Sequence, residues 1–131
     1  MNKSRRIKGI DSLLQKLPEE YHYWHCFGTI LMLNYEKTFD YEKKFENIDC
    51  INLILTDKEC KYKIKVKLND VIGDISFNVT NGFFSGLTIE DHYDDYAEYG
   101  YETDRCFLIT SFEQDIEFEL WCDSISVELL N

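Results

Sequence analysis

Residues 61–68 read K-Y-K-I-K-V-K-L, and this octapeptide carries the plainest structural signal in the chain. Its four lysines alternate strictly with four apolar residues: Tyr62, Ile64, Val66 and Leu68. Successive side chains of a β-strand point to opposite faces, so only a strand places all the lysines on one side and all the apolar residues on the other. The octapeptide therefore predicts a sheet that is buried on one face and exposed to solvent on the other.

The segments on both sides of this octapeptide predict further strands. Residues 48–56 and 59–68 indicate a hairpin that turns at Asp57-Lys58. Alternating runs predict strands at 75–80, 83–89, 106–112, 116–121 and 125–130, with turns at Asn81-Gly82, at 113–115 and near Asp123. Residues 21–35 are rich in aromatic and aliphatic residues and predict one long strand or two short ones, with Gly28 as a candidate bulge. Residues 38–45 are ambiguous.

One short helix is predicted near the N-terminus. Ile10, Leu13, Leu14 and Leu17 lie at positions i, i+3, i+4 and i+7, which places them on one helical face. Asp11 or Ser12 is the expected N-cap, and Pro18 ends the helix. We expect this helix to cover the sheet, and we expect residues 1–9 to form a flexible basic arm.

These elements together predict a mainly β fold. The expected architecture is an antiparallel β-sandwich or a strongly bent meander of about eight strands with one short N-terminal α-helix. A chain of 131 residues is the size of one ordinary domain, and no linker, internal repeat or low-complexity tract divides it. Residues 1–131 are therefore expected to form a single β-rich domain.

The sequence predicts a soluble, cytoplasmic protein. The basic N-terminus is not followed by the apolar run of a signal peptide, and no apolar stretch approaches the roughly 18–20 residues that span a bilayer. Five cysteines without a CxxC motif favour free thiols in a reducing compartment. A disulfide between Cys50 and Cys60, which flank the predicted hairpin, is the alternative.

Charge is distributed unevenly along the chain. The formal net charge is −11, and residues 1–68 contain 13 basic and 10 acidic residues. Residues 69–131 contain a single basic residue, Arg105, against 15 acidic ones. This asymmetry argues against binding of nucleic acid or an anionic membrane by the second half, and it favours a cationic partner.

Residues 90–104, E-D-H-Y-D-D-Y-A-E-Y-G-Y-E-T-D, are the candidate binding segment. Seven of these fifteen residues are carboxylates and four are tyrosines. A loop that only keeps the protein soluble is the simpler interpretation, but it does not explain the tyrosines, which are enriched at protein interfaces. The predicted partner-binding residues are the acids and tyrosines of this segment and two outward acids beyond it: Glu90, Asp91, Tyr93, Asp94, Asp95, Tyr96, Glu98, Tyr99, Tyr101, Glu102, Asp104, Glu117 and Glu119.

No catalytic, cofactor or metal signature appears in the sequence. G-x-S-x-G, H-E-x-x-H and phosphate-binding glycine-rich loops are all missing, so we expect no enzymatic activity and no cofactor. On a strand, His22 and His25 would point to opposite faces, which argues against a zinc site. The acids around Gly100 lack the order of an EF-hand loop.

The predicted lysine face has two interpretations. It would bind an anionic ligand or nucleic acid, or it is simply a solvated face that protects a strand edge. Pairing with Glu117 and Glu119 on a neighbouring strand is a further expectation.

The chain resembles the immunity proteins of bacterial polymorphic and contact-dependent toxin systems. The resemblance is one of overall style, and it lies in G-L-T-I-E-D at 86–91, the acidic segment, and R-C-F-L-I-T-S-F-E-Q-D-I-E-F-E-L-W-C-D-S-I-S-V-E-L-L at 105–130. It implies an acidic inhibitor that binds a basic partner toxin domain, such as a nuclease, and occludes its active site. The alternative is a small-ligand-binding β domain whose pocket is lined by aromatic residues such as Tyr23, Trp24 or Trp121.

Overall fold

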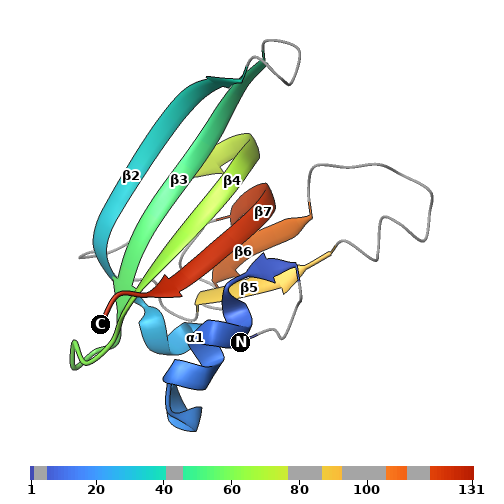
Figure 1. Cartoon of the computed structure of the whole chain (residues 1–131). Helices are drawn as coiled ribbons and strands as arrows, with labels where there is room; N and C mark the ends of the chain where they lie inside the picture. Colours follow the sequence, from blue (N-terminus) through green and yellow to red (C-terminus); the bar gives the residue numbers. More distant parts are fainter. Residues whose placement is uncertain (2–5, 41–45, 77–86, 93–105, 112–118) are drawn as a thin grey trace.

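The structure, a computed structural model, describes residues 1, 6–40, 46–76, 87–92, 106–111 and 119–131 (Figure 1). Within these residues seven strands form one sheet in the order β2-β3-β4-β7-β6-β5, and β1 pairs with β7 beside this path. The strands are β1 (Ile7–Lys8), β2 (Thr29–Asp40), β3 (Glu46–Thr56), β4 (Lys63–Ser76), β5 (Leu87–Asp91), β6 (Phe107–Ser111) and β7 (Glu119–Leu129). All neighbours are antiparallel except β1 and β7, which are parallel. The mainly β prediction is confirmed, and the described strands form one sheet rather than the two of a sandwich.

Strand β7 joins two antiparallel meanders, β2-β3-β4 and β5-β6-β7. One of its edges pairs with β4, from Leu129 opposite Ile64 to Glu119 opposite Ser76. Its other edge pairs with β6 at residues 119–122 and then with β1 at residues 125–126. The short strand β1 therefore continues the edge that β6 leaves free.

The N-terminal segment differs from the prediction. Residues 6–9 were expected in a flexible arm, but Ile7 is 1% exposed and pairs with Ile125, so the described part of the segment is fixed against the sheet. The apolar Ile7 supplies enough burial to hold a two-residue strand. Residues 2–5 lie outside the described residues.

The octapeptide folds as its alternation predicts. Ile64, Val66 and Leu68 are buried, whereas Lys63 and Lys67 are exposed and Lys65 is half-buried. The strand itself begins at Lys63, because residues 57–62 form the turn from β3.

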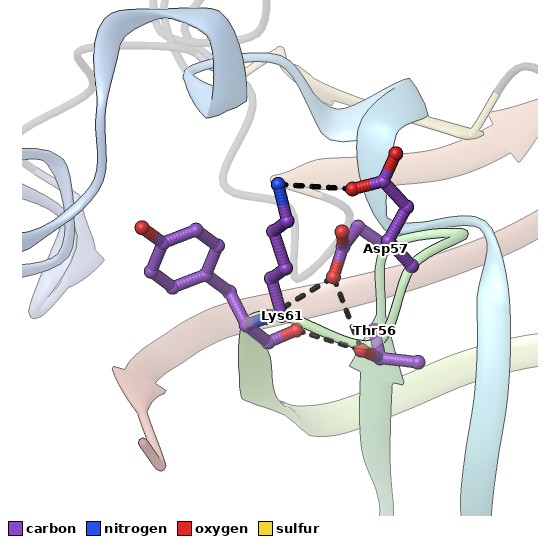
Figure 2. Close-up of polar contacts among 5 residues, drawn as sticks. Thr56, Asp57 and Lys61 are labelled. Atoms are coloured by element: carbon purple, nitrogen blue, oxygen red, sulfur yellow. Dashed lines mark hydrogen bonds and ion pairs between the residues drawn. The ribbon is translucent and has the colours of Figure 1, made fainter.

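Asp57 organises this turn from inside (Figure 2). Its side chain is 4% exposed, and Oδ1 accepts a hydrogen bond of 3.0 Å from the backbone N–H of Tyr62. The Thr56 hydroxyl donates to the carbonyl oxygen of Tyr62 at 2.8 Å. The turn therefore closes through buried polar groups that are mutually satisfied.

The helix α1 (Ile10–Lys16) and the short 3-10 helix η2 (Trp24–Phe27) cover the apolar side of the sheet (Figure 1). Ile10, Leu13, Leu17, Trp24 and Phe27 are all buried in the common core. The predicted packing of the helix and its end before Pro18 are confirmed. The predicted cap is wrong: Gly9 is the N-cap, and no side chain bonds to the helix start.

The predicted strand region 21–35 is wrong for residues 21–28. Two 3-10 helices, η1 (Glu19–Tyr21) and η2, precede β2, which starts at Thr29. The buried residues of this segment, Trp24 and Phe27, are three residues apart, which is the repeat of a 3-10 helix. The strand irregularity lies between Ile30 and Met32 and not at Gly28.

The predicted turn near Asp123 is also wrong, because β7 continues through it. The buried residues change phase there: Leu120 and Cys122 precede it, and Ile125 and Val127 follow it. On β4 the phase changes between Leu68 and Val71, around Asp70 with its positive φ of 54°. Both strands curve strongly in this region (Figure 1), so the break in the sequence pattern marks a bend instead of a strand end.

Candidate protein-binding surface

The candidate surface lies on the solvent-facing side of β5, β6 and the first half of β7. In β5 and β7, buried Leu87, Ile89, Leu120 and Cys122 alternate with more exposed neighbours. Glu90 lies opposite Leu108, and Leu108 lies opposite Trp121, so these three side chains form one row across the strands. The same alternation that fills the core thus brings Glu90 and Trp121 to one side.

His92 and Trp121 form the aromatic centre of this surface. The backbone N–H of His92 donates to the Cys106 carbonyl at 2.7 Å, which extends the β5–β6 pairing by one residue. The imidazole and indole centroids are 5.5 Å apart, within the range of attractive ring contacts.

A carboxylate holds each ring. The Glu90 carboxylate lies 3.1 Å from Nε2 of His92, and the indole N–H of Trp121 donates to Glu119 at 2.9 Å. Both contacts link side chains two residues apart on one strand, where they share a face. We call Glu90, His92, Glu119 and Trp121 the acidic patch.

The structure separates Asp91 from Glu90 and Glu119, the two other predicted partner-binding residues that it describes. Asp91 follows Glu90 on β5 and so points to the opposite side, where it pairs with Arg6 at 3.1 Å. Its side chain is 15% exposed. Of the predicted set, the structure therefore brings Glu90 and Glu119 together in the patch and places Asp91 elsewhere. Ten predicted residues lie outside the described residues: Tyr93, Asp94, Asp95, Tyr96, Glu98, Tyr99, Tyr101, Glu102, Asp104 and Glu117.

His92 and Trp121 are the patch residues that the predicted binding set left out. Trp121 was predicted only as a candidate residue of the alternative ligand pocket. Their signal in the sequence was their position, since each lies two residues from an acid, Glu90 or Glu119, in an alternating strand.

The aromatic residues of the alternative pocket occupy three different environments. Trp24 is buried in the core, Tyr23 is 55% exposed and stacks on His25, and Trp121 stands beside His92. They do not converge as an aromatic-lined ligand site requires.

The lysines of β4 do not pair with Glu119 as predicted. Glu119 lies opposite Ser76 and Thr110, at the far end of the β4–β7 ladder from Lys65 and Lys67. The error has a geometric cause, because the antiparallel register places Ser126 and Glu128 beside these lysines.

All five cysteines are free, including Cys50 and Cys60. Burial raises the pKa of the Cys122 thiol well above its usual range and also raises the pKa of Cys26, so both thiols stay protonated at neutral pH. Among the described residues, no three His, Cys, Asp or Glu side chains are grouped as metal ligands. His22 has a structural contact instead, with Nε2 2.7 Å from the Leu17 carbonyl oxygen.

Comparisons with protein-family models, with curated proteins and with solved structures found no match for this chain. None of the helices in the described part of the chain has the length and apolar character that crossing a bilayer requires.

Proposed function

We propose that this protein is a non-catalytic inhibitor that binds a basic protein partner through the acidic patch and the acidic segment that follows it. The observation that supports this proposal most directly is the pairing of two carboxylates with two aromatic rings on one solvent-facing side of the sheet. The acidic segment begins inside this patch, because Glu90 and His92 are among its first three residues.

The patch combines the two properties that a binding site for a basic partner needs. Trp121 is half-buried and its N–H is held by Glu119, so little side-chain entropy is lost when the indole becomes an interface anchor. The carboxylates of Glu90 and Glu119 would attract a basic surface and orient it during encounter.

The more specific form of the proposal follows from the resemblance to immunity proteins. In that form the partner is a toxin domain, and a nuclease fits best because its basic substrate groove must attract phosphate groups. An acidic surface that carries aromatic rings would compete for such a groove and occlude the active site.

The test uses the product of the reading frame next to this gene as the partner. We expect co-expression to relieve its toxicity and the purified proteins to form a complex. Trp121→Ala should weaken binding about 30-fold or more, as for a central aromatic anchor, and Glu90→Gln should weaken it less. Tyr23→Ala and Glu20→Gln, which remove an exposed ring and an exposed acid elsewhere, are the matched controls.

Circular dichroism would confirm that each variant is folded. Wild-type affinity in both Trp121→Ala and Glu90→Gln would contradict the proposed surface. An adjacent product that neither binds this chain nor is inhibited by it would contradict the immunity form.

A further inference from the structure

A second surface of opposite charge lies at the other end of β7. A pocket of about 320 Å³ is lined by Lys8, Gly9, Lys65, Lys67, Ser126, Val127 and Glu128. The volume falls at the lower end of the range for small-molecule sites.

Three strands build this pocket through their register. Ser126 of β7 lies between Lys8 of β1 and Lys67 of β4, so the hydroxyl stands in a row with a lysine on each side. Glu128 and Lys65 form the next row on the same face. The fixed N-terminal strand therefore supplies the third lysine of the site.

These lysines have no carboxylate within ion-pair distance among the described residues. The described ion pairs of other lysines are Lys37 with Asp49 at 3.8 Å and Lys61 with Glu59 at 3.0 Å. Even Glu128, directly opposite Lys65, forms no ion pair with it in the described part of the chain. Three lysines thus line one hollow on a protein whose net charge is −11.

We propose that this pocket binds the phosphate group of a small phosphomonoester. Three lysines and one glutamate give the pocket a formal charge of +2, which a phosphomonoester dianion neutralises. Lysine is a common phosphate ligand, and the Ser126 hydroxyl supplies a further donor from the position between Lys8 and Lys67. The Glu128 carboxylate would repel a ligand that carries further negative charge beside it. It would also accept a hydrogen bond from a hydroxyl group of the ester.

The site is independent of the acidic patch. Trp121 and Ser126 are five residues apart on β7, or about 17 Å along a strand. Opposite charge and this separation allow the two surfaces to be tested with separate variants, so failure of one proposal leaves the other in place.

The probes are inorganic phosphate and glycerol phosphate, titrated into the full chain at pH 7.5 with chloride at matched ionic strength as the reference. We expect saturable amide shifts in two-dimensional NMR at Lys8, Lys67 and Ser126, with a Kd in the millimolar range or tighter. Lys8→Gln and Lys67→Gln should each weaken binding about tenfold, as for a lost charge-assisted hydrogen bond. Glu128→Gln should strengthen binding of inorganic phosphate.

Lys63→Gln is the matched control. Lys63 lies on the same face of β4 but does not line the pocket, and its substitution removes the same charge. An equal loss of affinity in Lys63→Gln and Lys67→Gln would overturn the site, since it would reflect net charge alone. Shifts that do not saturate or that chloride reproduces would overturn it as well. Binding of a single-stranded oligonucleotide without terminal phosphate, in the absence of phosphate binding, would overturn it in favour of a nucleic-acid surface.

Discussion

Asp57 is the buried carboxylate on which the β3–β4 turn depends (Figure 2). Burial by itself would raise its pKa, but backbone N–H groups, that of Tyr62 first among them, outweigh burial and hold the pKa below its usual value. The ionised form is therefore the stabilising one. Its contribution is complete above the unfolded pKa of about 3.9 and is lost as the pH falls through the lower folded pKa.

We expect Asp57→Asn to lower the free energy of unfolding by about 1–2 kcal/mol at pH 7, since the charge that strengthens these hydrogen bonds is removed. The difference from the wild type should start to shrink below about pH 4, where the unfolded chain takes up the proton, and should vanish below the lower folded pKa. Urea denaturation at pH 7 and pH 3 measures both values. Asp11→Asn, at the exposed first turn of α1, should lower stability by no more than about 0.5 kcal/mol at either pH. A pH-independent loss in Asp57→Asn would contradict the role of the charge.

Gly9 makes the close approach that lets β1 turn directly into α1. Its φ is +88°, and a Cβ at this position would lie 2.3 Å from the backbone oxygen of Val127. Gly9→Ala should lower the free energy of unfolding by about 2 kcal/mol or more, because both the left-handed conformation and the contact with backbone are unfavourable. Thermal and urea denaturation would measure this loss, with Ser12→Ala expected to stay within about 0.5 kcal/mol of the wild type. A tolerated alanine at position 9 would mean that the junction rearranges.

Strand β1 shows that two residues are enough to fix a segment when one of them is buried. We expect Ile7→Ala to lower the free energy of unfolding by about 3 kcal/mol, the usual cost of truncating a core isoleucine. Lys8→Ala, on the same strand but exposed, should have little effect on stability. Equal stability of the two variants in urea denaturation would contradict the anchoring role of Ile7.

Strand β2 is the edge of the sheet, and among the described strands it pairs only with β3. It exposes Leu31, Met32, Leu33 and Tyr35 at 39–48%. Long apolar edges favour strand addition between molecules. Leu33→Lys should therefore slow aggregation on mild heating, as followed by light scattering, with little change in stability. Asn34→Lys adds the same charge without removing an apolar side chain, so it should slow aggregation less. If both variants slow aggregation equally, the effect would come from the added charge and not from the lost apolar side chain.

The elements were predictable where a single period governs the pattern. The strand at residues 61–68 follows from a period of two and the buried face of α1 from a period of 3.6. Both patterns are local, so the sequence alone was sufficient to predict these elements. The N-terminal strand was not predictable in this way, because Ile7 is one apolar residue in a basic segment and its strand is defined by a partner about 120 residues away. The bend at Asp123 was misread because a phase change and a chain reversal interrupt alternation in the same manner.

The charge asymmetry of the sequence does not divide the folded molecule into two lobes. β4, which begins in the first half, pairs with β7 from the second half, so that Lys65 lies opposite Glu128 in one ladder. What remains is a polarity along β7, with Glu119 near one end and the lysine-lined pocket near the other. Composition predicted that a charged site would exist, and strand alternation predicted an outward position for Glu119. The place of Glu90 in the same patch comes from the register of β5, β6 and β7. The position of Lys8 beside Lys65 and Lys67 could not be predicted from the sequence, because it depends on the pairing of β1, which was itself not predicted.

This polarity gives the proposed association a specific dependence on salt. The association rate constant with the adjacent gene product should fall by about tenfold or more between 50 and 500 mM salt, because attraction between exposed charges is screened over about 10 Å at 0.1 M. The dissociation rate should change much less, since it depends on packed contacts such as that of Trp121. Stopped-flow fluorescence of the tryptophans would measure the association rate.

Two double variants separate the acidic patch from net charge in this experiment. Glu90→Gln with Glu119→Gln removes two charges from the patch, and Glu19→Gln with Glu20→Gln removes two exposed charges from η1. If the patch steers the partner, only the first pair should slow association and flatten its salt dependence, because steering depends on where charge lies on the approaching surface. Equal effects of the two pairs of substitutions would assign the attraction to the net charge of the whole molecule. An association rate that does not change with salt would contradict a basic partner.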